Sequence, residues 1–92
     1  MAIKVRIPQP LRGLTGNESV VDGGGASLSA CIADLESRFP GVKERVLDDT
    51  GELRRFVNVY INGDDVRFID GLNSPLKDGD EVSIVPAVAG GA

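Results

Sequence analysis

The sequence predicts an α+β fold in which a mixed sheet of four to five strands covers one main helix. Two observations carry this prediction. Short segments of strand-like pattern occur in both halves of the chain, and one segment between them has apolar residues at helical spacing. The 92 residues suit one domain whose core leaves little room for a large enclosed pocket.

The first strands are predicted from alternation. Residues 3–7 alternate between apolar and basic side chains, so one face of this strand is apolar and the other wet. Pro8 and Pro10 end the strand because proline has no N–H for a ladder. Residues 11–18 are expected to form a loop, and residues 19–21 a short second strand, antiparallel to the first.

The main helix is predicted to follow the glycines at 23–25, with Ser27 as its N-cap. Its apolar stripe consists of Leu28, Ile32, Leu35 and Phe39. Pro40 and Gly41 stop it, and residues 42–47 could add another helical turn.

The strongest strand signal covers residues 56–61, and Asn62-Gly63 forms a turn after it. Residues 66–68 are expected to form a short return strand, and residues 72–76 a loop or tight turn. Residues 82–85 form the last strand, which Pro86 closes.

This order places the first and last strands side by side and parallel, which is the β-grasp arrangement. We therefore expect a β-grasp domain over residues 1–86 and a flexible C-terminal tail, residues 87–92, carrying Gly90 and Gly91.

Composition excludes several functions. The chain has 14 acidic and 10 basic residues, for a net charge of −4, and no basic run, so we expect no nucleic-acid partner. No segment has enough apolar residues for a membrane span, and one cysteine allows no internal disulfide; we expect a cytoplasmic protein.

The sequence gives little support for an enzyme, because the chain has no histidine, the commonest general base. Cys31 lies beside the apolar helix stripe and is expected to be a buried core thiol. We expect no catalytic residue, no metal site and no bound cofactor in the chain itself.

The C-terminus is different. Six residues follow Pro86 and reach about 20 Å when extended. Gly90 and Gly91 have no Cβ, so their backbone could enter a narrow channel in another protein. A frayed terminus remains the alternative.

Strand parity predicts a docking surface. Val57, Val59 and Ile61 should face the helix, so Phe56, Asn58 and Tyr60 point outward, beside Ser83 and Val85. Two outward aromatics favour a partner-binding face, although incidental surface or cover by a loop is also open. The predicted partner-binding residues are Phe56, Tyr60, Val85, Pro86 and Val88.

Three stretches, residues 56–63, 77–82 and 86–91, resemble the ubiquitin-like sulfur carriers of the ThiS/MoaD family. The similarity is greatest to the CysO-type carriers of actinobacteria, where it extends to residues 64–68 and to the ending Pro-Ala-Val-Ala-Gly-Gly.

This resemblance implies that an adenylyltransferase like the ubiquitin-activating enzymes uses ATP to activate the carboxylate of Gly91. A sulfur donor then forms a thiocarboxylate, which a sulfur-accepting synthase uses to make cysteine, a thiosugar or another metabolite. A ubiquitin-like modifier joined through Gly91 to lysines would use the same activated glycine, and a passive interaction domain would not need it.

One feature departs from the family: Ala92 follows Gly91 and occupies the carboxyl group that this chemistry needs. The resemblance then implies a precursor whose Ala92 is removed by a JAMM-type zinc metalloprotease. The other explanation is that Ala92 is foreign to the natural chain.

Overall fold

The computed structural model describes residues 3–86, which share one hydrophobic core. The strands are β1 (Ile3–Arg6), β2 (Val20–Gly23), β3 (Val57–Ile61), β4 (Asp64–Asp65) and β5 (Glu81–Pro86). The helices are α1 (Leu28–Arg38) and α2 (Val42–Val46), with 3-10 turns η1 (Gln9–Leu14), η2 (Val66–Phe68) and η3 (Gly71–Asn73). The division at residue 86 stays a prediction, because residues 87–92 lie outside the described part.

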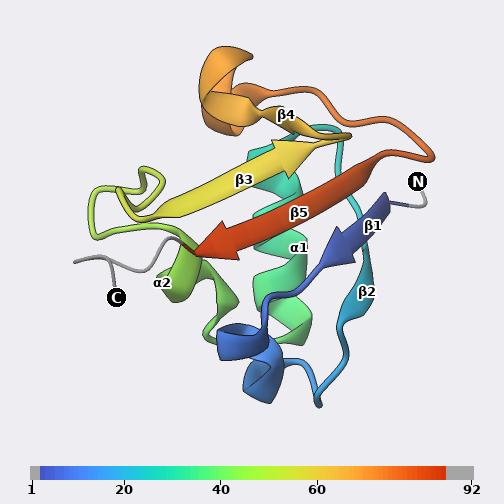
Figure 1. The fold of residues 1–92 in the computed structure, drawn as a ribbon, viewed down its shortest axis with the longest axis vertical. Helices are drawn as coiled ribbons and strands as arrows, with labels where there is room; N and C mark the ends of the chain where they lie inside the picture. Colours follow the sequence, from blue (N-terminus) through green and yellow to red (C-terminus); the bar gives the residue numbers. More distant parts are fainter. Residues whose placement is uncertain (1–2, 87–92) are drawn as a thin grey trace.

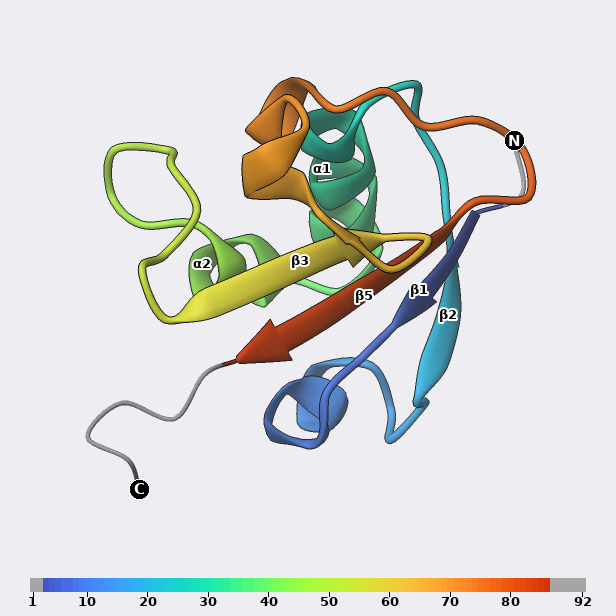
Figure 2. The ribbon, with the colours of Figure 1, turned by 45° about the horizontal axis from the view of Figure 1, so that its top comes forward.

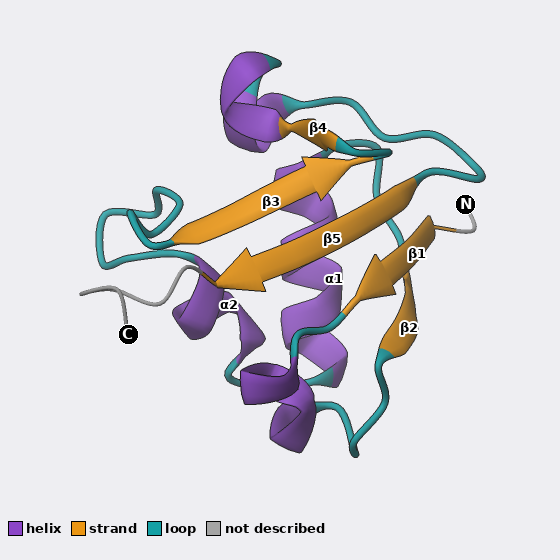
Figure 3. Ribbon diagram, viewed as in Figure 1, coloured by secondary structure: helices purple, strands orange, loops and turns teal. Residues whose placement is uncertain are grey.

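The five strands form one mixed sheet in the order β2-β1-β5-β3-β4. β5 lies in the middle, parallel to β1 and antiparallel to β3. β1 and β2 pair antiparallel, with Val5 opposite Val21. Both α-helices lie behind this sheet in the view of Figure 1, and no helix crosses its near face in Figure 3. The α+β, ubiquitin-like β-grasp prediction is confirmed.

The core lies between the sheet and α1, as the two periodicities predict. Ser27 caps α1, and its hydroxyl oxygen accepts a hydrogen bond from the Ala30 N–H at 3.2 Å. The α1 residues that face the sheet are Leu28, Cys31, Ile32 and Leu35, all buried. The inward residues of β3 and β5 are Val57, Val59, Ile61, Val82 and Ile84. The predicted core face and the buried thiol are therefore confirmed, except that α1 ends at Arg38 and Phe39 is only partly buried.

The predicted loop at residues 11–18 is wrong at its start, because the chain from Gln9 to Leu14 forms η1. Proline stands in the first turn of η1, where its missing N–H costs nothing, and Leu11 is buried. Thr15 is 2% exposed, and its hydroxyl donates to the carbonyl oxygens of Arg12 and Glu18 at 3.3 and 3.0 Å. Local side-chain hydrogen bonds of this kind make a compact turn. The sequence showed only glycines and prolines in this segment, and these predicted a loop.

The predicted return strand at residues 66–68 is also wrong. The strand after the Asn62-Gly63 turn is β4, two residues long, and the chain then turns into η2. The Asp65 carboxylate caps this turn by accepting from the Arg67 N–H at 2.8 Å, while Val66 is fully buried. The side-chain cap ends the strand at Asp65, although the strand-like pattern of the sequence continues to residue 68.

Smaller differences concern boundaries. Val42–Val46 forms the expected extra helical turn, and the tight turn predicted within residues 72–76 is η3. β3 begins at Val57, one residue after the predicted start, and β5 extends through Pro86.

A polar network joins the Asn62-Gly63 turn to the turn at residues 77–80. Both turns lie at the end of the sheet where β3 finishes and β5 begins (Figure 2). Asn62 and Gly63 both have positive φ, +52° and +90°, as the turn prediction requires. The buried Asp80 carboxylate accepts from Asn62 Nδ2 and from the Lys77 N–H, both at 2.9 Å. Asn62 Oδ1 in turn accepts from the Glu81 N–H at 3.0 Å.

Among residues 3–86, no helix combines the length and the apolar character needed to cross a bilayer.

Candidate functional site

The candidate site lies at the end of β5, the strand that precedes the predicted C-terminal tail. Pro86 is the last described residue, and it pairs with Val57, the first residue of β3. The C-terminal segment therefore starts beside the turn that precedes β3. Val88, Gly90, Gly91 and Ala92 lie outside the described residues, so their predicted roles remain predictions.

The face of the sheet opposite α1 carries the predicted docking residues. Tyr60 pairs with Ser83, and Asn58 pairs with Val85. Val85 is 43% exposed, while Asn58, Tyr60 and Pro86 are half-buried. Strand parity therefore placed Tyr60 and Val85 correctly on the outer face. Their part in binding a partner stays a prediction.

Phe56 lies close to this face but not in a strand. It occupies the turn between Arg54 and Val57, closed by a hydrogen bond from the Val57 N–H to the Arg54 carbonyl oxygen at 3.1 Å. Its side chain is 51% exposed. Phe56 is thus exposed as predicted, but a turn presents it rather than the pleat of β3.

A hollow of about 390 Å³ continues the apolar surface from β5 toward β1 and β2. Its apolar lining includes Pro8, Val20 and Val85, and Arg12 stands at its side. Sequence reasoning missed this hollow because four elements, β1, η1, β2 and β5, build it. Strand parity could have identified Val20 as an outward residue, because it precedes the buried Val21. In the structure Val20 is 41% exposed.

The opposite end of the outer face is charged, and its charges are paired. Arg6 Nε lies 3.1 Å from Glu81 Oε2, and Lys4 Nζ lies 2.8 Å from Asp22 Oδ1. Hydrogen bonding to Lys4 and the Lys4 charge hold the pKa of Asp22 below its ordinary value. Such exposed pairs contribute little to stability. Arg6 also lines the hollow beside Val20, so charged and apolar side chains adjoin on this face.

The described residues offer little to catalysis. Residues 3–86 contain no group of three or more acidic, cysteine or histidine side chains that could hold a metal ion. Burial, with the nearby Asp34 charge, raises the pKa of Cys31 to about 11, so its thiol is protonated at neutral pH.

Comparison with known proteins gives the family. The ThiS family profile matches residues 5–91. The sulfur carrier protein CysO of Mycobacterium tuberculosis is 48% identical over 93 aligned positions, covering 99% of this chain and all of that protein. The small archaeal modifier protein 3 of Haloferax volcanii is 36% identical over 94 positions, covering 99% and 100% of the two chains.

A solved structure gives the same result. The crystal structure of the Amycolatopsis orientalis BexX/CysO complex contains a chain with a TM-score of 0.92 and 49% identity. The match covers 98% of this chain and all of the other. Proteins of this kind are small carriers, in agreement with the prediction that the chain is not an enzyme. The chain therefore belongs to the ThiS family, as a sulfur carrier protein of the CysO-like kind.

Proposed function

We propose that this carrier transports sulfur as a thiocarboxylate on Gly91. The observation that supports this most is the end of β5: Pro86 leaves the sheet beside an exposed apolar face, with Phe56 and Val85 at its sides. From there, the five residues 87–91 span about 17 Å when extended, enough to enter a partner's catalytic cleft. The glycines at 90 and 91 give that end the smallest cross-section.

The cycle begins by exposing the carboxylate. A JAMM-type zinc metalloprotease hydrolyses the Gly91–Ala92 amide. An adenylyltransferase like the ubiquitin-activating enzymes then joins the Gly91 carboxylate to the α-phosphate of ATP and releases pyrophosphate. A sulfur donor displaces AMP from the acyl group. The resulting thiocarboxylate is an anionic sulfur nucleophile, which a sulfur-accepting synthase uses to make cysteine, a thiosugar or another metabolite.

The outer face would dock these partners. Phe56, Tyr60, Val85, Pro86 and Val88 are the residues proposed for contact, and the hollow beside Val20 extends the same surface. A few central residues, most often Trp, Tyr or Arg, contribute most of the binding energy of an interface, and Tyr60 is of this kind. The crystallised complex of a CysO with BexX supports the view that carriers of this type bind a second protein. We assign the cycle to the cytoplasm, where ATP and reduced sulfur are available.

Pyrophosphate release tests the proposal. The chain ending at Gly91 should support ATP-dependent pyrophosphate release by a matched activating enzyme, whereas the chain ending at Ala92 should not. Gly91→Ala in the chain that ends at residue 91 should keep the wild-type melting temperature and give no thiocarboxylate. Equal activity of the chains ending at 91 and 92 would contradict the requirement for a free glycine carboxylate.

A second candidate is a protein modifier, favoured by the similarity to the archaeal modifier protein. In that case a lysine amine, rather than a sulfur nucleophile, would attack the activated Gly91. Peptides with a Gly91–lysine isopeptide bond, formed when chain, enzyme and ATP are added to cell extract, would support it.

A further inference from the structure

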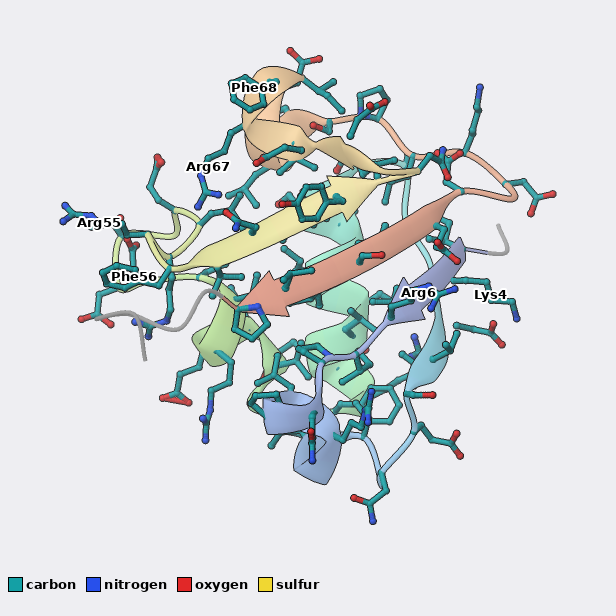
Figure 4. The ribbon with its side chains drawn as sticks, viewed as in Figure 1. Lys4, Arg6, Arg55, Phe56, Arg67 and Phe68 are labelled. Atoms are coloured by element: carbon teal, nitrogen blue, oxygen red, sulfur yellow. The ribbon has the colours of Figure 1, made fainter. Side chains whose placement is uncertain are left out.

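Arg67 makes an unusual set of contacts in a stretch, residues 64–68, to which the proposed function gives no role. Its Nη1 donates to Asn58 Oδ1 at 2.7 Å. Its Nη2 donates to two backbone carbonyl oxygens, that of Arg54 at 2.9 Å and that of Val57 at 2.8 Å. Figure 4 shows the side chain extending from η2 toward the turn that carries Arg55 and Phe56.

The two carbonyl groups are the two ends of one tight turn. Arg54 and Val57 are its first and last residues, and Arg55 and Phe56 occupy its corners. On its other side, the Arg54 N–H donates to the Val46 carbonyl at 3.0 Å, and Arg54 Nε donates to that of Glu44 at 2.9 Å. The turn is thus held between α2 and the Arg67 guanidinium.

Phe56 depends on this turn for its orientation. Its ring is half-exposed, so burial alone does not fix it, and the backbone at the turn decides where it points. The next residue, Val57, pairs with Pro86, from which the C-terminal segment starts. A shift of the turn would therefore move Phe56 relative to the point where the chain leaves the sheet.

Arg67 is itself firmly anchored. Its N–H is bonded to the Asp65 carboxylate, and its neighbour Val66 is fully buried. Two guanidinium nitrogens serve three acceptors here, because the planar fork presents its donors in fixed directions. A lysine at this position would offer one nitrogen and could not reproduce the arrangement.

We propose that Arg67 is a positioning residue for Phe56: it fixes the turn from Arg54 to Val57 and so presents the ring beside the end of β5. The consequence for partner binding rests on the proposed function, with the activating enzyme supplying an apolar site for the ring. The fixing of the turn does not depend on any partner.

Hydrogen exchange of the free protein tests the first half. In Arg67→Met and in Arg67→Lys, the Val57 amide should exchange at least about tenfold faster, since charge-assisted bonds that hold its acceptor are lost. The Ile84 amide, in the middle of the sheet, should be unchanged. Arg38→Met is the matched control, because it removes the same charge, and its bonds go to Asp22 in the opposite edge strand, β2, and to Asp34 in α1. Wild-type exchange at Val57 in an Arg67→Lys variant that folds would overturn the proposal.

Kinetics with the activating enzyme test the second half. Arg67→Met should raise the KM for the carrier about tenfold without changing kcat, and Phe56→Ala should do the same. The double variant should be no worse than Phe56→Ala alone, because Arg67 acts through that ring. If the increases in KM of the two single variants multiply in the double variant, the positioning role is overturned. A wild-type KM in Arg67→Met would also overturn it. If wild-type chain is never adenylated, the proposed function fails, and the exchange result still decides the role of Arg67.

Discussion

Single residues on β3 show how strictly the sheet separates its two faces. Val59 is completely buried against the core, whereas its neighbour Tyr60 is half-buried on the outer face. The alternation of a strand places adjacent side chains on opposite sides, so adjacent substitutions probe two environments in one backbone. This feature was predictable from sequence, because parity depends on local pattern alone.

Val59→Asp should unfold the domain at room temperature. An unpaired buried carboxylate costs about 3–5 kcal/mol, a large part of the stability of a small domain. Tyr60→Asp is the matched control, with the same new charge one residue away on the open face. Thermal unfolding followed by circular dichroism should show a cooperative transition for Tyr60→Asp alone. Equal stability of the two variants would contradict the assignment of faces.

Asp80 should make stability depend on pH in the acid range. Hydrogen bonds from Asn62 and from the Lys77 N–H hold its pKa below the ordinary value of 3.8. The stabilisation from a depressed carboxyl pKa is fully present above the unfolded value and is lost as pH falls through the folded one. Asp80→Asn should therefore be less stable than wild type at pH 7, and the difference in unfolding free energy should narrow below about pH 4. A difference independent of pH, in urea titrations at several pH values, would contradict this.

At the scale of elements, the junction between β2 and α1 has no room for a side chain at Gly25. Gly25 has φ of +119°, and a Cβ there would lie 2.8 Å from the Ala30 Cβ and 2.9 Å from the Cys31 nitrogen. Only glycine combines that dihedral with the close approach of α1. The sequence showed three glycines but not that a Cβ would overlap its neighbours at Gly23 and Gly25 and not at Gly24.

Gly25→Ala should lower the free energy of unfolding by about 2–3 kcal/mol, from backbone strain and overlap with α1. Gly13→Ala is its control, since a Cβ at Gly13 has nothing within 4 Å. Urea unfolding of both variants measures the difference. Comparable stability of Gly25→Ala and Gly13→Ala would show that α1 can shift to accept the methyl group.

Elements with a clear period were predictable, and those made by side-chain bonds were not. The main helix and the longer strands follow from the spacing of apolar residues. The parallel pairing of the first and last strands in the sequence follows from the order of the elements. The η1 and η2 turns depend on the Thr15 hydroxyl and the Asp65 carboxylate, which no periodicity reveals. For the same reason the sequence suggested the outer face but neither the Arg67 contacts nor the hollow beside Val20.

At the scale of the whole molecule, the domain presents one open face of the sheet beside the end of β5. The helices cover the other face, and paired charges occupy the end remote from Pro86. Under the proposed function, this face supplies recognition and a partner enzyme supplies the chemistry.

Tyr60→Asp should weaken binding to the activating enzyme about tenfold or more while leaving the domain folded, because a charge would be desolvated in an apolar interface. Isothermal titration calorimetry with the chain ending at Gly91 measures this. Glu18→Gln, an exposed change outside the outer face, is the control. Unchanged affinity in Tyr60→Asp would remove Tyr60 from the docking surface.

The location of the transferred sulfur tests the central claim most directly. After incubation with activating enzyme, ATP and sulfide, the chain ending at Gly91 should gain about 16 Da, as one oxygen is replaced by sulfur, and fragmentation should place the gain on Gly91. Cys31→Ser should gain the same mass, since the Cys31 thiol is buried and protonated. An unchanged mass of the chain ending at Gly91, or an equal gain in the chain ending at Ala92, would contradict the account.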